Sequence, residues 1–459
     1  MKIDKWKMKI TRLRRGMYLP AILMASVIFI AFATAIISIS LSNVKIANLH
    51  NKKITSMSIA EAGINYYLWH LSHDNEDYCD GQTCIGSVEY GPYTHEYKDQ
   101  SGDSLGTYDL YITPPSIGDA KVRVKSIGKV NGSSPRRTVI AELGMPSFTK
   151  YTLLANNSEL WIGSGETING SVFVNHSGVK NDGTITRDVS STEDTYFSNM
   201  FHTTLDGING NGTFGGAKLF PVPTIDFGKL DVDVRTIRDE AKDDGEGDYY
   251  DSSGSQGYHL ILGINQYELR KVTKFSNSEY SITTESNIGN YDYPTEGILF
   301  FEDNVWVEGT VSGKQITILA ADPEANQSQR KRIIIVNNLK YTNYDGADKI
   351  GLITQTDILL PRNAPSTLEI DAAMIAKNGQ IKIDSYCSPS QTCDDDHKTS
   401  IKVYGSMAHN AGLVWTYDYD GRWSGYQTTE TVIDEHNVLN PPPKFPLTGT
   451  YAILSWREE

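Results

Sequence analysis

Residues Met17–Leu41 read MYLPAILMASVIFIAFATAIISISL and carry no charged side chain. A bilayer core about 30 Å thick is crossed by roughly 20 apolar residues in a helix, and within it only a helix or a closed barrel satisfies the backbone hydrogen bonds. The sequence therefore predicts a transmembrane helix. A cleavable secretory signal fits less well, because its apolar region spans only about 7–15 residues and ends at a small-residue cleavage site.

The residues before this run are strongly basic. Met1–Gly16 carries seven basic side chains and one acidic side chain, and positively charged flanks remain on the cytoplasmic side of a membrane. We therefore expect a cytoplasmic leader over 1–16 and a body outside the cytoplasm. The chain has a formal net charge of −14 and the leader contributes +6, so the other residues carry −20. Because nucleic-acid-binding surfaces are basic, we expect no nucleic-acid partner.

A continuous helix is predicted over 17–72, because apolar residues continue to recur three and four positions apart beyond the bilayer. Small residues near its end would let another backbone approach closely. Two interpretations are open for this segment: a core helix that packs on the chain's own first domain, or a rod that packs among identical or related rods. The predicted assembly face for the second consists of Met57, Ala60, Glu61, Gly63, Ile64, Tyr67 and Leu71.

After the helix, the pattern changes to strands and turns. Gly106–Thr113 and Lys121–Val130 alternate apolar and polar residues, and Arg136–Leu143 follows a turn. This pattern predicts a small antiparallel sheet that the end of the helix can cover. We therefore expect a small α+β unit over 73–148.

The rest of the chain, 149–459, is predicted to be a β-rich body. Short apolar runs such as Leu160–Ile162 and Val172–Val174 alternate with turns that contain Gly or Asn, a spacing that fits a solenoid or a β-sandwich. We favour an irregular solenoid-like body, because several strands are apolar at nearly every position. One amphipathic helix, at 230–242, interrupts it. The predicted fold class is mainly β, behind a long N-terminal transmembrane α-helix.

The four cysteines fall into two local pairs, Cys79 with Cys84 and Cys387 with Cys393. Outside the cytoplasm, such pairs can close small loops as disulfides. Free thiols are the alternative. A zinc site is not expected, because neither pair belongs to a cluster of four ligands.

Three features stand together near the N-terminus: Arg14–Gly16, the apolar run, and Ser58–Gly63 with the sequence SIAEAG. Together they resemble the N-terminal region of PilX-like type IV pilus assembly proteins, which are minor pilins. The resemblance implies that a prepilin peptidase cleaves after Gly16 and leaves Met17 as the new N-terminus. It also implies that the helix assembles with other pilin-like subunits, at the inner-membrane assembly machinery, into a pilus or pseudopilus. The later part of the chain looks like large bacterial envelope proteins that carry such an N-terminus.

One position departs from the pattern of major pilins, which carry a glutamate five residues after the cleavage point. Here that position is Ala21. In the family the glutamate is thought to pair with the N-terminal amine of the neighbouring subunit inside the fibre. An unpaired buried amine is costly, so the departure favours a subunit at the tip over one in the shaft. It also leaves open a membrane-anchored protein in which Gly16 is never cleaved.

The sequence offers little sign of catalysis or metal binding. It contains no H-E-x-x-H or C-x-x-C motif, so we predict no catalytic residue, no metal site and no enzyme. Two acidic clusters are weak candidates for calcium, which prefers oxygen ligands; solvated or charged turns are the alternatives. The first cluster comprises Asp243, Asp244, Glu246, Asp248 and Asp251, and the second comprises Asp394, Asp395 and Asp396 with His397.

Four aromatic residues form a candidate ligand surface near the C-terminus: Trp415, Tyr417, Tyr419 and Trp423. Exposed aromatic rings favour binding and could stack on sugars, while core packing is the alternative. We expect a single-pass minor-pilin-like subunit whose body is displayed outside the cell for capping, adhesion or uptake. Its expected partners are membrane lipid, other pilin-like subunits and surface carbohydrate. The alternatives are a membrane-tethered binding protein outside any fibre and a polysaccharide lyase built on a solenoid.

Overall fold

The computed structural model describes residues 18–74, 77–114, 121–276, 280–384, 397–419, 422–448 and 451–459. The chain divides into two compact units, of which the second is Met145–Ala452 and the first contains the segments on both sides of it. The predicted body, 149–459, therefore begins close to the observed boundary but extends too far. Ile453–Glu459 belongs to the first unit, so the body is an insertion between two parts of the first unit.

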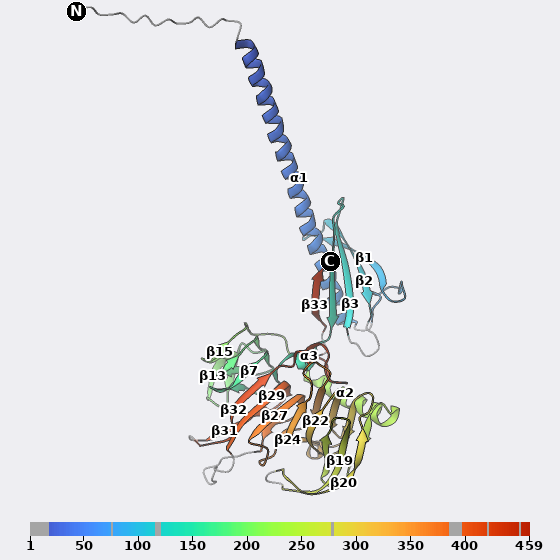
Figure 1. The fold of residues 1–459 in the computed structure, drawn as a ribbon, viewed down its shortest axis with the longest axis vertical. Helices are drawn as coiled ribbons and strands as arrows, with labels where there is room; N and C mark the ends of the chain where they lie inside the picture. The colour runs from blue at the N-terminus through green and yellow to red at the C-terminus, as the bar shows by residue number, and fades with distance from the viewer. Residues whose placement is uncertain are drawn as a thin grey trace, which may run out of the picture. The chain divides into compact units, whose positions relative to one another are not determined.

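The first unit combines one long helix with an antiparallel sheet (Figure 1). Helix α1 spans Tyr18–His73, 56 residues, or about 84 Å at 1.5 Å per residue. Its C-terminal part packs on β2, β3 and β4. Among the described residues, five strands pair in the order β1-β2-β3-β4-β33. Their bounds are β1 Tyr90–Lys98, β2 Ser104–Thr113, β3 Lys121–Val130, β4 Arg136–Gly144 and β33 Ala452–Glu458.

Alternation along the strands places one face of this sheet against the helix. In β2, Tyr108, Leu110 and Ile112 are buried while the residues between them are half-exposed, and β3 buries Val122 and Val124 in the same way. Side chains two residues apart in a strand share a face, so these residues form one apolar surface. The predicted small α+β unit is present, with strand bounds close to those expected.

The last strand of the chain returns to the edge of the first unit's sheet. β33 lies next to β4, and its end is held by the hydrogen bond from Glu459 N to Thr138 O, 3.0 Å. Arg137 Nη1 lies 2.8 Å from Glu458 Oε1, and Ser455 Oγ donates to Glu142 Oε2 over 3.1 Å. The local sequence of this strand does not identify β4 as its partner.

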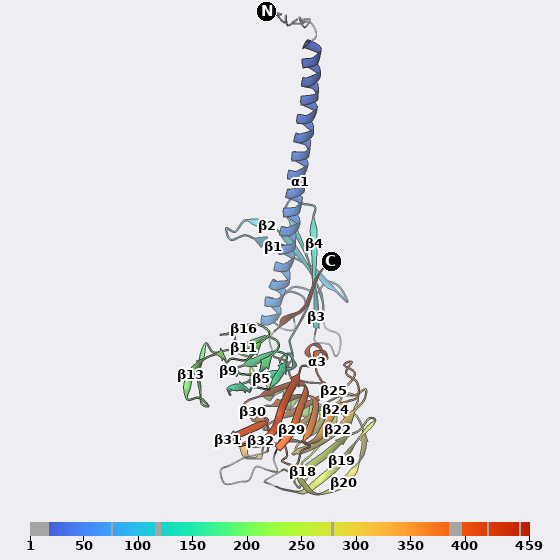
Figure 2. The same ribbon diagram turned by 60° about the vertical axis from the view of Figure 1, so that its left-hand side comes forward.

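The second unit is a stack of turns in which each strand pairs in parallel with the strand one turn away (Figure 2). Three faces are repeated along the stack. Face A consists of β17 Asp248–Tyr250, β21 Ile298–Phe301, β23 Gln315–Ala320, β25 Lys349–Thr354, β27 Thr367–Ala376, β29 His397–His409, β5 Leu153–Ala155, β8 Val172–Val174, β11 Val189–Ser191 and β16 Lys218–Leu219.

The other two faces complete each turn. Face B consists of β18 Gly257–Leu262, β22 Val305–Val311, β24 Ile333–Tyr341, β26 Ile358–Leu360, β28 Gln380–Ile383, β30 Gly412–Val414, β6 Leu160–Ile162, β9 Val179–Asn181 and β14 Ile208–Asn209. Face C consists of the ends of β22 and β24, the starts of β27 and β29, and β32 Arg422–Val432, β7 Thr167–Asn169, β10 Thr184–Ile185 and β15 Thr213–Phe214.

Antiparallel strands and short helices lie outside the three faces of the stack. Their bounds are β12 Thr195–Ser198, β13 Thr203–Asp206, β19 Gln266–Phe275, β20 Ile282–Asp292, β31 Thr416–Tyr419, α2 Leu230–Asp239, α3 Glu435–Leu439, η1 Phe148–Lys150, η2 Phe227–Lys229, η3 Glu240–Asp244 and η4 Gln327–Gln329. The prediction of a mainly β fold behind a long helix is confirmed. Parallel pairing between turns corresponds to the solenoid-like interpretation, because a sandwich is built from antiparallel sheets.

The chain enters this stack in the middle. β5, the first strand of the body, pairs with β29 near its end, and the chain then winds outward through β8 and β11 to β16. It crosses through α2 to β17 at the opposite end and winds back through β21, β23, β25 and β27 to β29. In Figure 2 the green strands at the start of the body accordingly lie beside the orange and red strands at its end.

Helix α2 makes this crossing while it covers face A. Val234, Ile237 and Ala241 join an apolar cluster with the outward side chains of face A, among them Phe300 and Ile353. The inward side chains of the same strands lie in the main core. Face A is therefore buried on both sides, which explains why its strands are apolar at nearly every position. The predicted helix at 230–242 is present as α2 followed by the π-helical turn η3.

An asparagine ladder joins the two halves of the body where they meet. Asn156 Nδ2 donates to Asn410 Oδ1 over 2.9 Å, and Asn175 Nδ2 donates to Asn156 Oδ1 over 2.9 Å. Stacked asparagines of this kind lock successive parallel turns in register. Nearby, the first and last segments of the body are tied together, because Thr448 N donates to Pro146 O over 2.8 Å and Ser147 Oγ donates to Pro446 O over 3.1 Å. Adjacent ends are what an inserted domain requires.

Candidate functional site: the two-part helix and its sheet

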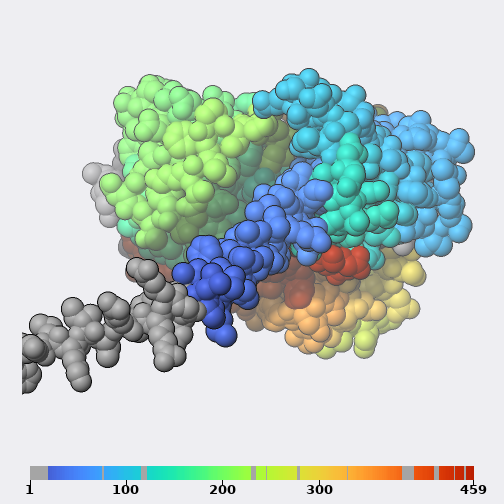
Figure 3. All heavy atoms as spheres, turned by 90° about the horizontal axis from the view of Figure 1, so that it is seen from above, coloured from blue at the N-terminus to red at the C-terminus, as the bar shows by residue number. Residues whose placement is uncertain are grey.

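The N-terminal part of α1, dark blue in Figure 3, is an apolar rod whose large side chains are exposed. Phe29 is 75% exposed, Phe32 66% and Ile37 57%. Helix α1 is long and apolar enough to cross a membrane, judged by length and composition. A helix that is apolar all round is stable only inside a protein or in lipid, and exposed apolar surface of this extent marks a membrane or protein contact.

The C-terminal part of the same helix is buried against the chain's own sheet. Ile59, Ala60, Tyr67 and Leu71 are fully buried. Two glycines allow the close approach. A Cβ at Gly63 would lie 2.3 Å from Ser126 Oγ, and a Cβ at Gly128 of β3 would lie 2.1 Å from Ser56 O and 2.5 Å from Ala60 N. Helix backbone and sheet backbone therefore meet with no room for a methyl group.

This packing corrects the predicted assembly face. Ala60, Gly63, Ile64, Tyr67 and Leu71 face the unit's own β2–β4 sheet and are not available to another subunit. Met57 and Glu61, the other two members of that face, are half-exposed. Periodicity correctly identified a buried helical stripe, but the partner is the sheet that follows in the same chain, as the core-helix interpretation held. The long exposed stretch of the helix is the segment before it, Leu19–Ile54, and within the later part Trp69 is also exposed.

A disulfide loop follows the end of α1. Cys79 and Cys84 are bonded, which confirms the prediction for this pair. Asp77 organises the loop: its carboxylate accepts hydrogen bonds from Cys79 N, 2.9 Å, and Gly81 N, 2.5 Å, and lies 3.1 Å from His70 Nε2. Burial opposes ionisation of Asp77, but the two backbone donors and the His70 ring together lower its pKa. The loop is thus fastened to the last turn of the helix.

A polar and aromatic group lies beside this loop, between α1 and the sheet. His95 Nε2 lies 2.6 Å from Asp80 Oδ2, and the His95 ring stacks on Tyr108 with centroids 5.3 Å apart. Burial, followed by the negative charge of Asp80, raises the pKa of Tyr66 to about 12. These contacts fix α1 relative to β1 and β2.

The predicted aromatic ligand surface is largely part of the core. Trp415 is 5% exposed and belongs to the main core of the body, while Tyr417 packs against that core. Trp423 is half-exposed and stacks on His397 with centroids 4.1 Å apart. The strand that carries Tyr419 is described, but its side chain is not. The prediction of a sugar-stacking face here is wrong for Trp415, because alternate positions of this segment point into the stack.

The acidic loop offered for calcium has other contacts. Asp248 accepts a hydrogen bond from Tyr267 Oη over 2.5 Å, and Glu246 lies 3.8 Å from Lys444 Nζ. Asp243 is exposed in η3, and the side chain of Asp244 is not described. Within the parts of the chain that the structure describes, no group of three or more His, Cys, Asp or Glu residues could hold a metal ion.

Several predicted sites lie outside the described residues. They are the processing site Gly16 and Met17, the cysteines Cys387 and Cys393, and the acidic cluster Asp394, Asp395 and Asp396.

Residues Gly102–Gly106 have the sequence GDSLG, which matches the G-x-S-x-G motif of serine hydrolases. Ser104 begins β2, which is paired antiparallel on both sides, so it does not sit on the strand-to-helix turn that exposes a nucleophile.

Comparison with known proteins adds little. No family model matches the chain, and no curated protein matches it. Among solved structures, the crystal structure of the competence-associated pilin ComZ from Thermus thermophilus is similar at 13% identity, over 89% of this chain and 97% of that one, with a TM-score of 0.28. A likeness of this size carries no argument about this chain.

Proposed function

We propose that this chain is a non-enzymatic, minor-pilin-like subunit. The exposed segment of α1 anchors it in a membrane and assembles with other pilin-like subunits, while the inserted body is displayed outside the cytoplasm. The observation that carries the proposal is the division of one helix into an exposed apolar half, Leu19–Ile54, and a half buried in its own sheet from Ile59 onward. Such a helix holds a folded unit at one end and leaves the other for lipid and neighbouring helices.

The uncharged part of the exposed half supports both roles. Tyr18–Val44 contains no charged residue and is about 40 Å long as a helix, which exceeds the bilayer core of about 30 Å. Lys45, Lys52 and Lys53 follow, where the helix would leave the lipid. The basic leader before it supports a cytoplasmic N-terminus.

Two details of the proposal come from the resemblance to PilX-like minor pilins. Cleavage after Gly16 would place Ala21 at the position where shaft pilins carry glutamate. A subunit without that carboxylate cannot neutralise a neighbour's terminal amine within the apolar bundle, so we place the subunit at the tip of a pilus or pseudopilus. A body displayed there would serve capping or adhesion.

A photoreactive residue tests the assembly surface. Placed at Ile37, which is 57% exposed, it should cross-link the chain to a second pilin-like subunit in isolated envelope membranes. Placed at Ile64, which is 2% exposed, it should form only cross-links within the chain, to the sheet. The readout is the mass of the cross-linked products by immunoblot and peptide mass spectrometry.

The two positions serve as matched controls, because both are isoleucines on the same helix. Cross-links from Ile37 to lipid alone would replace the proposal with the membrane-tethered protein that never enters a fibre. Subunit cross-links from Ile64 would show that the buried half of α1 leaves its own sheet, and would contradict the proposal.

A further inference from the structure

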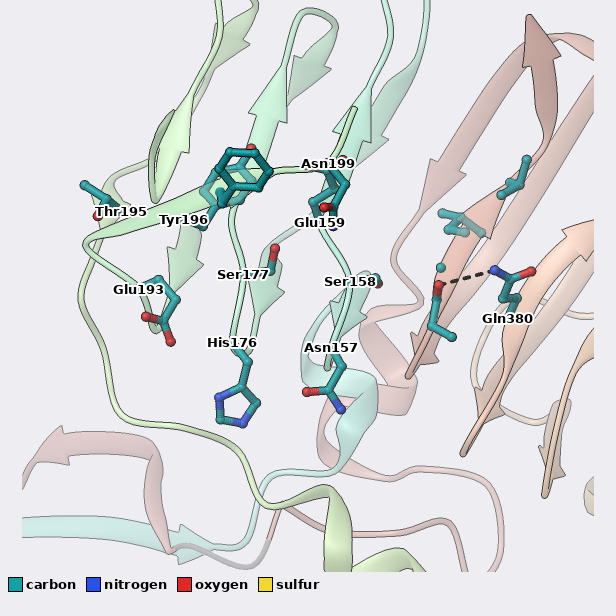
Figure 4. A pocket seen from close by; sticks show the side chains of 15 residues that line it. Asn157, Ser158, Glu159, His176, Ser177, Glu193, Thr195, Tyr196, Asn199 and Gln380 are labelled. Carbon is teal, nitrogen blue, oxygen red and sulfur yellow. Dashed lines mark hydrogen bonds between the residues drawn. The ribbon is translucent and has the colours of Figure 1, made fainter. Parts of the chain in front are cut away.

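A polar groove runs along the outside of the body, at the junction of its two halves (Figure 4). Its volume is about 560 Å³, within the range of ligand sites, about 300–1,000 Å³. The lining comes from consecutive turns of the stack, near Gln380, Gly412, Asn157, His176 and Glu193. With adjacent strands about 4.8 Å apart, four spacings give a groove of about 19 Å, which suits an extended ligand.

The groove is lined by side chains that can donate or accept hydrogen bonds, together with two carboxylates that only accept. Asn157 Nδ2 is tied to Asn410 Oδ1, 2.8 Å, and Gln380 Nε2 to Ala411 O, 3.3 Å. Each amide therefore still has its carbonyl oxygen and its second N–H for another partner. Glu159 and Glu193 add two carboxylates, and Figure 4 shows Glu193 and Asn157 on opposite sides of His176. A lining of this kind suits an uncharged ligand whose groups can both donate and accept hydrogen bonds, and the two carboxylates require donors from it.

An aromatic ring supplies the apolar contact. Phe197 lines the groove and is 59% exposed, next to Tyr196, whose ring lies on the bare backbone of Gly178, where a Cβ would be 2.1 Å from Tyr196 Cε1. Met200 and Phe201 follow in the same hairpin, 50% and 41% exposed. Large apolar side chains gathered on a surface mark a binding site, and of these three Phe197 lines the polar groove itself.

We propose that this groove binds an uncharged oligosaccharide, with sugar hydroxyls donating to Glu159, Glu193, Asn157 and Gln380, and a ring face packed on Phe197. The hydroxyl groups of a sugar supply many donors along an extended chain, and its C–H face is apolar. An acidic polysaccharide fits poorly, because the two carboxylates would repel it and the groove offers no Lys or Arg among its lining residues.

Titration calorimetry of the detergent-solubilised full-length protein tests the proposal. The probes are hexasaccharides of uncharged sugars (cellohexaose, isomaltohexaose and chitohexaose) and hexagalacturonic acid as the acidic counterpart. We expect at least one uncharged hexasaccharide to bind, and hexagalacturonic acid to bind more weakly or not at all. Loss of a charged hydrogen-bond acceptor or of the ring contact should weaken binding about five- to tenfold, as Glu193→Gln and Phe197→Ala respectively.

Matched controls separate the groove from the rest of the surface. Glu296→Gln changes an exposed glutamate in a loop outside the groove, and Trp456→Ala removes a ring that is 49% exposed in the first unit; both should leave affinity unchanged. Circular dichroism of each variant verifies folding. The proposal is overturned if none of the uncharged hexasaccharides binds, if hexagalacturonic acid binds more tightly than they do, or if the groove variants bind as well as the controls.

Discussion

Replacing Gly128 with alanine is expected to separate α1 from its sheet. The added methyl group would lie 2.1 Å from Ser56 O and 2.5 Å from Ala60 N, and these are backbone atoms of the helix that cannot rotate away. Overpacking of a core commonly lowers the free energy of unfolding by about 1–3 kcal/mol. Because the clash here is with backbone atoms, we expect Gly128→Ala to lower the free energy of unfolding by about 3 kcal/mol or more. Hydrogen exchange measured by mass spectrometry should show faster exchange across β2, β3 and the end of α1.

The nearby turn provides a control of the same chemistry. Gly132 follows β3, and a Cβ built there meets nothing within 4 Å. Its φ of +63° means that Gly132→Ala pays only the left-handed backbone cost, about 1–2 kcal/mol. Exchange in β2 and β3 that is equally fast in both variants, or unchanged in Gly128→Ala, would contradict the tight helix–sheet contact on which the two-part helix depends.

The second large effect is acid sensitivity of the body caused by His409. This residue ends β29, is fully buried, and has no hydrogen-bond partner on either ring nitrogen among the described residues. Its register neighbours in the flanking strands are Ala155 and Ala376, so the ring lies in an apolar interior. Burial lowers the pKa of His409 from 6.5 to about 4.

The direction of the pH effect follows from this shift. The unfolded chain binds the proton near pH 6.5 and the folded chain only near pH 4, so stability is lost as the pH falls between these values. From pH 7 to pH 4.5 the loss is about 2.5 kcal/mol at 1.36 kcal/mol per pKa unit. His409→Phe removes the titrating group while keeping a ring. The difference in free energy of unfolding between the variant and the natural chain should therefore shift by about this amount in favour of the variant when the pH is lowered from 7 to 4.5.

Denaturant unfolding in detergent, followed by tryptophan fluorescence, measures this difference, since Trp306 and Trp415 are buried reporters in the body. Asp371 has the opposite dependence, because burial raises its pKa to about 6; both proteins contain it, so it cancels in the comparison. The exposed His202, which has a positive φ of 50°, provides the control His202→Asn. Parallel pH profiles for His409→Phe and the natural chain would show that His409 is not buried as a neutral ring.

Much of the local structure follows directly from the sequence. The run from Met17 predicts α1 almost to its observed end at His73, and the alternation in β2 and β3 predicts the sheet. These features depend on residues a few positions apart, whose periodicity reflects the element that they form. The helix at 230–242 is predictable for the same reason, because its apolar side chains recur every three to four residues.

What the sequence leaves open is which surfaces meet. The apolar periodicity at Ile64 and Tyr67 predicts that this face of α1 is buried. It does not distinguish burial against a sheet of the same chain from burial against a neighbouring subunit, because both require apolar residues at the same positions. The pairing of β29 with β5 joins residues about 250 positions apart, and in a parallel stack every strand is apolar enough to pair with any other. The return of β33 to the first unit is hidden for the same reason.

The oligosaccharide groove could not be found from sequence either. Its polar residues come from two segments that are far apart in the sequence of the body. Gln380 and Asn157 come together only because the chain enters the stack in the middle. The aromatic residues around Trp415 are close together in sequence, which favours a shared surface, but alternation directs the Trp415 side chain into the core. The exposed rings of the β12–β13 hairpin were a weaker signal: Phe197 and Phe201 stand in a polar, strand-like segment with no core to join.

The central claim is that the exposed half of α1 is a membrane-embedded stem that carries a folded body out of the cytoplasm. Mass spectrometry of the N-terminus of the protein, after fractionation of cells into cytosol, membranes and sheared surface fibres, tests it most directly. The account predicts a chain that begins at Met17 and stays in the membrane or fibre fraction until detergent is added. A full-length chain beginning at Met1 and freely soluble in the cytosol without detergent would contradict it.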